Sequence, residues 1–83
     1  AFPAVDLAKS VGRAGATFPA VYNAANEQAV DAFHEGRLSF LAIVETIARV
    51  IDAHEPPQSL TVESLAEAEA WARRKADQLI AQA

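Results

Sequence analysis

Apolar residues recur at intervals of three and four along almost the whole chain, and glycine or proline interrupts the recurrence at a few places. A repeat of this period gives an α-helix one apolar face, whereas a half-buried strand alternates with a period of two. No stretch of the sequence alternates in that way. The interruptions at "GRAG", at Gly36 and at "HEPP" are typical of helix ends. The pattern predicts an all-α domain, a small bundle of four helices with short connections.

The residues at the interruptions predict where each helix begins and ends. The first helix is expected over about Pro3 to Val11, and the second over about Phe18 to Glu35 with Thr17 as its N-cap. The third begins after Ser39, a further N-cap, and stops at "HEPP". Leu38, just before that cap, is expected to pack on Ile43 as a hydrophobic staple, and Gly36 is expected to terminate the second helix. The fourth is expected over Val62 to Ala81, capped by Ser59 or Thr61.

The core is expected to centre on the third helix, which has the most apolar stripe in the chain. Alanine is the commonest residue and often falls on the inner faces, where each copy buries little area. We therefore expect the few large residues to provide much of the buried surface. These are Phe2, Phe18, Tyr22, Phe33, Phe40 and Trp71.

Length and charge limit the classes of function. A chain of 83 residues is enough for one domain, 1–83, and too short for two separate cores. The net charge is -4, and the single basic run, 73–75, is typical of a solvated helix face, so no nucleic-acid partner is expected. No apolar run approaches the roughly 20 residues of a membrane helix, and cysteine is absent, which fits a cytoplasmic protein. The chain starts at Ala1 rather than methionine, which suggests a piece of a longer chain.

The most unusual stretch is "YNAANEQAVDAFHEG", because Asn23, Asn26 and Glu27 lie within little more than one turn of a predicted helix. Asparagine is a poor helix former, since its amide competes for backbone groups. Spacings of three and four place the three side chains near one flank. We interpret them as a structural or interdomain polar cluster, which ties the helix to a nearby loop or to another domain. Under the structural reading, Asn26→Ala should cost roughly 1 to 3 kcal/mol through a lost buried hydrogen bond.

Other arrangements of polar residues do not predict a catalytic, cofactor-binding or metal site. The glycines fit neither a dinucleotide-binding fingerprint nor a P-loop. Glu27, Asp31 and His34 have helical spacing that could suit a metal, but the Glu-x-x-His arrangement of di-iron bundles needs a second copy. A solvated face is the simpler interpretation of these three. His54, before Pro56, is interpreted as a cation near a helix C-terminus.

A family resemblance is carried by an ordered set of motifs that covers essentially all 83 residues. These are "NAANE", the "AF" that follows it, "GRLSF" and the "A-x-x-WAR" pattern of the last helix. In this order they resemble the C-terminal domain of 1-deoxy-D-xylulose 5-phosphate reductoisomerase. The set is specific, although no single motif would be.

The resemblance implies properties of a longer parent enzyme. That family converts 1-deoxy-D-xylulose 5-phosphate to 2-C-methyl-D-erythritol 4-phosphate in non-mevalonate isoprenoid synthesis, with NADPH and a divalent cation (Mg or Mn). It is typically a cytoplasmic homodimer in bacteria. The nucleotide-binding and catalytic domains precede the C-terminal domain, so no catalytic residue is carried over to this chain. The implied role is structural support of the catalytic domain of the same chain, without activity alone. The alternative is a free-standing helical protein-interaction module.

Overall fold

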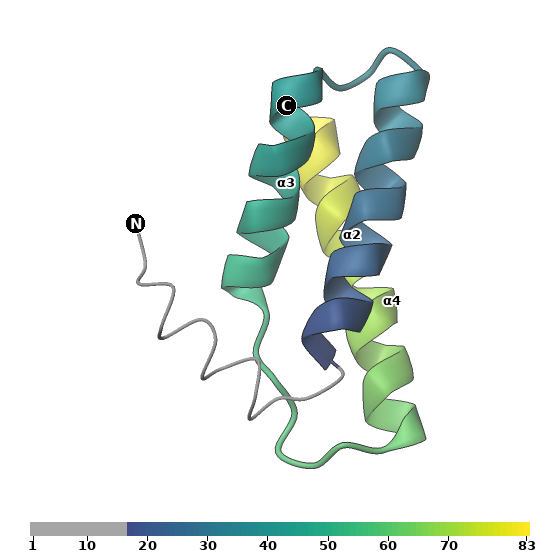
Figure 1. Ribbon diagram of the computed structural model, residues 1–83, viewed down its shortest axis with the longest axis vertical. Coiled ribbons are helices and arrows are strands. Elements are labelled where there is room, and N and C mark those ends of the chain that lie inside the picture. The colour runs from purple at the N-terminus through teal and green to yellow at the C-terminus, as the bar shows by residue number, and fades with distance from the viewer. Residues whose placement is uncertain (1–16) are drawn as a thin grey trace.

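A computed structural model describes residues 17–83, and within that range the chain forms three α-helices and no strand. They are α2 (Thr17–His34), α3 (Phe40–Ala53) and α4 (Val62–Gln82). Successive helices run in opposite directions, with α2 and α3 side by side in the view of Figure 1 and α4 behind them. The all-α prediction is confirmed for these residues. The helix predicted over Pro3 to Val11 lies outside the described residues, so the count of four is not matched by the structure and stays a prediction.

The predicted N-caps are confirmed for α3 and α4 but not for α2. The Ser39 hydroxyl accepts a hydrogen bond from the Ala42 amide at 3.2 Å at the start of α3. Thr61 caps α4, and its backbone amide and hydroxyl exchange hydrogen bonds with Ser64 in a capping box. The prediction for Thr17 was wrong, because Thr17 is itself the first residue of α2 and is buried.

Gly36 terminates α2 as predicted. Its φ of 77° lies in the left-handed region that favours glycine. The Gly36 amide donates to the Phe33 carbonyl at 3.0 Å, and the Arg37 amide donates to the Ala32 carbonyl at 2.9 Å. These two bonds form a Schellman motif, which satisfies carbonyls that the helix end leaves open. Leu38 is then buried in a cluster against which Ile43 packs, as the predicted staple requires.

Alanine builds most of the core that holds the three helices together. The fully buried side chains of α2 and α4 are mainly alanines. The largest fully buried apolar side chains in the described residues are Val21 on α2 and Val50 on α3. Small side chains let helix axes approach closely. The buried alanines are Ala24, Ala25, Ala29, Ala32, Ala68, Ala72 and Ala76.

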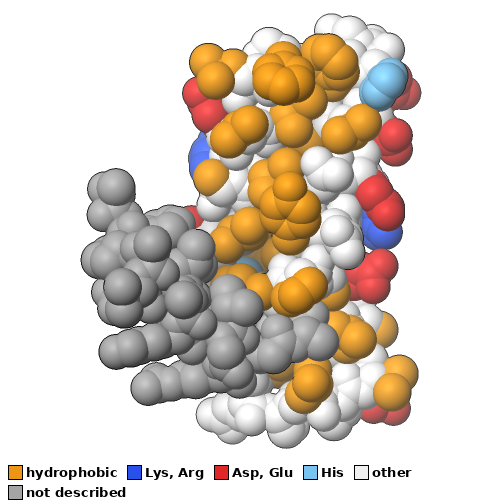
Figure 2. All heavy atoms as spheres, viewed as in Figure 1, with side chains coloured by type: hydrophobic (Ala, Val, Ile, Leu, Met, Phe, Trp, Pro, Cys, Tyr) orange, Lys and Arg blue, Asp and Glu red, His pale blue; other side chains and the backbone are white. Residues whose placement is uncertain are grey.

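Two predictions about the core were wrong. The helix with the most extensive contacts to the other two is α2, whereas α3 buries only Thr46, Ile47 and Val50. Three of the large residues do not provide the expected burial either: Phe40 is 72% exposed, and Tyr22 and Phe33 are also exposed. Phe18 and Trp71 are half-buried, and Phe2 lies outside the described residues. Figure 2 shows hydrophobic side chains along the face formed by α2 and α3. Close packing of alanine therefore replaces the bulky core that the sequence suggested.

The longest helix, α4, is amphipathic in the predicted sense. Ala68, Ala72, Ala76 and Leu79 are buried on one face, and charged residues occupy the other. Across residues 17–83, no helix combines the length and apolar character needed to cross a membrane.

Candidate functional site

The three polar residues of the "NAANE" stretch do not meet at one point on α2. Asn23 and Glu27 are exposed, and Asn26 is half-buried. Neither asparagine side chain forms a hydrogen bond to a residue in the range 17–83. Glu27 instead reaches toward α4, where its carboxylate lies 2.8 Å from Arg73.

Arg73 is the centre of the polar contact between α2 and α4. Its guanidinium also donates to the Gln28 side-chain oxygen at 3.1 Å and to Glu69, one turn earlier on α4, at 3.4 Å. The hydrogen bond to Glu27, followed by the charges of Glu27 and Glu69, raises the pKa of Arg73 although burial acts in the opposite direction. Gln28 completes the contact by donating to Asp77 at 2.7 Å. The contact fixes how α2 lies along α4.

Asn26 lies on a different flank of α2. It follows Tyr22 by four residues and precedes Phe33 by seven, so the three side chains line up along the helix. Phe33 contacts Phe40 of α3, with ring centroids 6.2 Å apart, which identifies this flank as the one next to α3. Asn26 therefore stands among apolar residues, and Glu27 stands among charged ones.

The structure does not bring Glu27, Asp31 and His34 into a ligand set. Glu27 pairs with Arg73, and the His34 ring packs edge-on against Phe33 at 5.7 Å between centroids. The described part of the chain contains no group of three or more His, Asp or Glu side chains that could hold a metal ion.

His54 lies at the C-terminus of α3 as predicted, but its surroundings are not those of a solvated cation. Its backbone caps α3 by donating to the Ile51 carbonyl at 3.2 Å. Its ring is half-buried between Phe18 of α2, 5.0 Å away between centroids, and Trp71 of α4, 5.5 Å away. Burial lowers the pKa of His54, so the imidazole is neutral near pH 7, contrary to the predicted cation. Nothing in the local sequence indicates this contact, because Phe18 and Trp71 are far from His54 along the chain.

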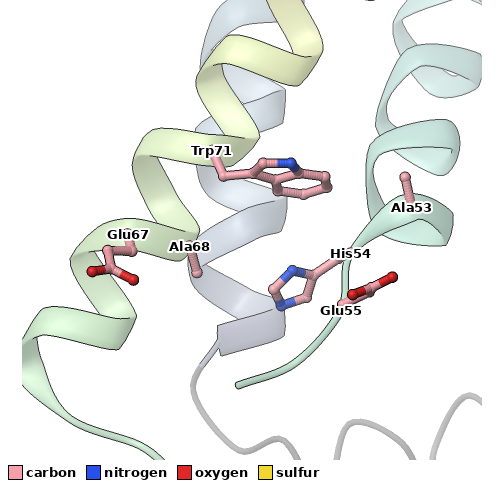
Figure 3. A pocket seen from close by; sticks show the side chains of 6 residues that line it. All are labelled: Ala53, His54, Glu55, Glu67, Ala68 and Trp71. Atoms are coloured by element: carbon pink, nitrogen blue, oxygen red, sulfur yellow. The ribbon is translucent and has the colours of Figure 1, made fainter. Parts of the chain in front are cut away.

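A pocket of about 450 Å³ opens beside this imidazole, between the end of α3 and the first half of α4 (Figure 3). Among the described residues, its lining contains no serine, threonine or cysteine. The Nε2 atom of His54 is buried and has no hydrogen-bond partner among the residues that the structure describes. The described lining thus combines a neutral imidazole and an indole with two carboxylates, and it offers no hydroxyl or thiol nucleophile. It is formed by Ala53, His54, Glu55, Glu67, Ala68 and Trp71.

Comparison with known proteins gives a consistent match. The family model described as the DXP reductoisomerase C-terminal domain matches residues 1–75. A 1-deoxy-D-xylulose 5-phosphate reductoisomerase from Leifsonia xyli is 65% identical over 80 residues, which cover 96% of this chain and 22% of the relative. The protein of the same name from Paenarthrobacter aurescens is 57% identical over 75 residues, which cover 90% of this chain and 19% of the relative. A further protein of this name, from Citrifermentans bemidjiense, is 48% identical over 79 residues, which cover 95% of this chain and 20% of the relative. The chain thus spans about a fifth of the length of the relatives that it matches.

Proposed function

Because the chain belongs to the family of DXP reductoisomerase C-terminal domains, we propose that it is the C-terminal support domain of a reductoisomerase. The match to that family over residues 1–75 is the observation that carries the proposal. The domain extends over residues 1–83 as one helical unit, with the helix predicted over Pro3 to Val11 as its fourth. Of the motifs that carry the resemblance, "NAANE" and "AF" lie on α2, and "GRLSF" spans the connection to α3 and its first residue.

The reaction belongs to the parent chain. We propose that the complete polypeptide converts 1-deoxy-D-xylulose 5-phosphate to 2-C-methyl-D-erythritol 4-phosphate with NADPH and a divalent cation, as a cytoplasmic homodimer in isoprenoid biosynthesis. The described residues fit neither the cation nor NADPH. They include no cluster of acidic or histidine side chains that could hold the cation, and α2, α3 and α4 do not form the Rossmann unit that binds a dinucleotide. NADPH and the cation are therefore assigned to the preceding part of the polypeptide.

The contribution of this domain is mechanical. The Arg73 contact and the close alanine packing hold α2 against α4, so the domain can act as a fixed block beside the catalytic domain. We propose that Glu27 serves the fold of this block, and that Asn23 and Asn26, which pair with no residue in 17–83, serve an interdomain contact.

A deletion tests this role. The complete polypeptide and a version that ends before Thr17 are assayed for consumption of NADPH with 1-deoxy-D-xylulose 5-phosphate. We expect the deletion to lower turnover or thermal stability of the remaining domains, because their supporting surface is lost. A complete polypeptide with full turnover and unchanged stability after the deletion would contradict the support role. It would favour the interaction module.

A further inference from the structure

An apolar face on α2 and α3 remains uncovered by the rest of the described chain. We define it as the α2–α3 apolar face, and Figure 2 shows it along the two helices. Phe40 and Leu41 are 72% and 69% exposed at the start of α3, and the other members are exposed as well. Its members are Tyr22, Phe33, Phe40, Leu41 and Val44.

The size of this face is at the upper end of the range for the largest apolar patch on a soluble monomer. Since an aromatic side chain offers about 150–250 Å², the exposed fractions of the five side chains amount to on the order of 500 Å². Soluble monomers rarely leave larger contiguous apolar patches open, and patches of this size are often functional. Phe33 and Phe40 already contact each other edge to face, so the two helices present one surface.

A polar group accompanies the apolar ones. Asn26 lies in line with Tyr22 and Phe33, it is half-buried, and its amide has no partner in residues 17–83. An apolar centre with a polar group able to donate and accept hydrogen bonds at its edge is the composition of a protein interface.

The length of the relatives identifies the occupant. The chain spans about a fifth of each relative, so four fifths of such a polypeptide lies outside it. With a matching area on the other side, a face of roughly 500 Å² gives an interface of roughly 1,000 Å², which is within the range between domains of one chain. The covalent link keeps the local concentration of the two domains high.

We infer that the α2–α3 apolar face is the surface on which the preceding part of the same polypeptide docks. This inference rests on the proposed function and specifies where the support is given. Phe40 and Leu41, the most exposed members of the face, enter the contact, and Asn26 forms hydrogen bonds between Tyr22 and Phe33. The pocket beside His54 remains outside it.

Side-chain footprinting of the complete polypeptide tests the inference. A photochemically generated carbene labels exposed side chains, and Val62 provides a matched control, because Val62 and Phe40 are both first residues of a helix that follows a hydroxyl cap. We expect Phe40 and Leu41 to be labelled several-fold less than Val62, although all three are well exposed in the domain alone. Equal labelling of the three would overturn the inference.

Two further samples separate other occupants. In the 83-residue chain, protection of buried Val21 reports that the domain is folded. Protection of Phe40 there as well would mean that residues 1–16 cover the face, and would overturn the inference. Protection in the complete polypeptide that disappears on dilution would point to a second copy, with the same consequence.

Substitutions give a test that does not depend on labelling. In the complete polypeptide, Phe40→Glu should expose the junction before the domain to proteolysis, whereas Val62→Glu should not. Equal sensitivity of the two variants would overturn the inference. If the unmodified polypeptide shows no reductoisomerase turnover, the proposed function fails; if turnover is present and Phe40 is labelled like Val62, only the docking surface fails.

Discussion

The guanidinium of Arg73 on α4 lies 2.8 Å from the carboxylate of Glu27 on α2, 46 positions earlier in the sequence. This pair links the "NAANE" stretch to the last helix. It also turns Glu27 away from the flank that carries Asn26, so the two residues serve different contacts.

The Glu27–Arg73 pair should contribute a small, salt-sensitive stabilisation. Both side chains are partly exposed, and such pairs are screened by salt. Glu27→Gln should lower the urea midpoint of the 83-residue chain slightly at low salt and should not lower it at about 1 M salt. Glu45→Gln, on the exposed side of α3, is the control. Equal shifts in the two variants would show that the pair adds nothing specific.

Because the buried alanines pack closely, we expect position 72 on α4 not to tolerate a larger side chain. Ala72 is fully buried, so Ala72→Leu is expected to destabilise the chain by about 1–3 kcal/mol through overpacking. Ala70→Leu, on the exposed side of the same helix, should be nearly neutral. Urea unfolding measures both. A neutral Ala72→Leu would mean that the helices are not in close contact there.

Asn26→Ala should be almost neutral in the 83-residue chain, in contrast to the loss of 1–3 kcal/mol expected from sequence. Its amide has no partner in residues 17–83, and alanine is the better helix former, so the change should stay within about 0.5 kcal/mol. Asn23→Ala, on the exposed side, is the comparison. A loss above about 1 kcal/mol for Asn26→Ala alone would indicate a buried hydrogen bond.

Acid should destabilise the domain through His54. Burial lowers its pKa below the ordinary value of 6.5, so in the interval between the two the unfolded chain binds more protons than the folded chain. The contribution to stability is complete above pH 6.5 and is lost as pH falls through the folded-state pKa. His54→Phe keeps a ring between Phe18 and Trp71 and should flatten the dependence of unfolding free energy on pH. The control variant His34→Gln should keep the dependence of the unfolding free energy on pH. If His54→Phe also keeps this dependence, His54 is not its source.

Local signals were enough to predict the helix ends. Ser39, Thr61 and Gly36 act through hydrogen bonds to residues three or four positions away, so their roles can be read from neighbouring letters. The exception is Thr17, which lies within α2 rather than before it.

Contacts between helices could not be predicted in the same way. An apolar stripe indicates that a helix face tends to be covered, but it does not identify the element that covers it. Phe40 was therefore assigned to the core, although it is exposed. The Glu27–Arg73 pair and the ring contacts of His54 depend on how α2, α3 and α4 lie against one another. The family resemblance identified the domain, yet it assigned no contact to any single residue of "NAANE".

The most direct test of the central claim is a side-by-side assay of the complete polypeptide and the 83-residue chain. Both are measured for NADPH binding by calorimetry and for turnover of 1-deoxy-D-xylulose 5-phosphate. A support domain predicts binding and turnover in the complete polypeptide and neither in the 83-residue chain. NADPH binding by the 83-residue chain, or a complete polypeptide without turnover, would contradict the account.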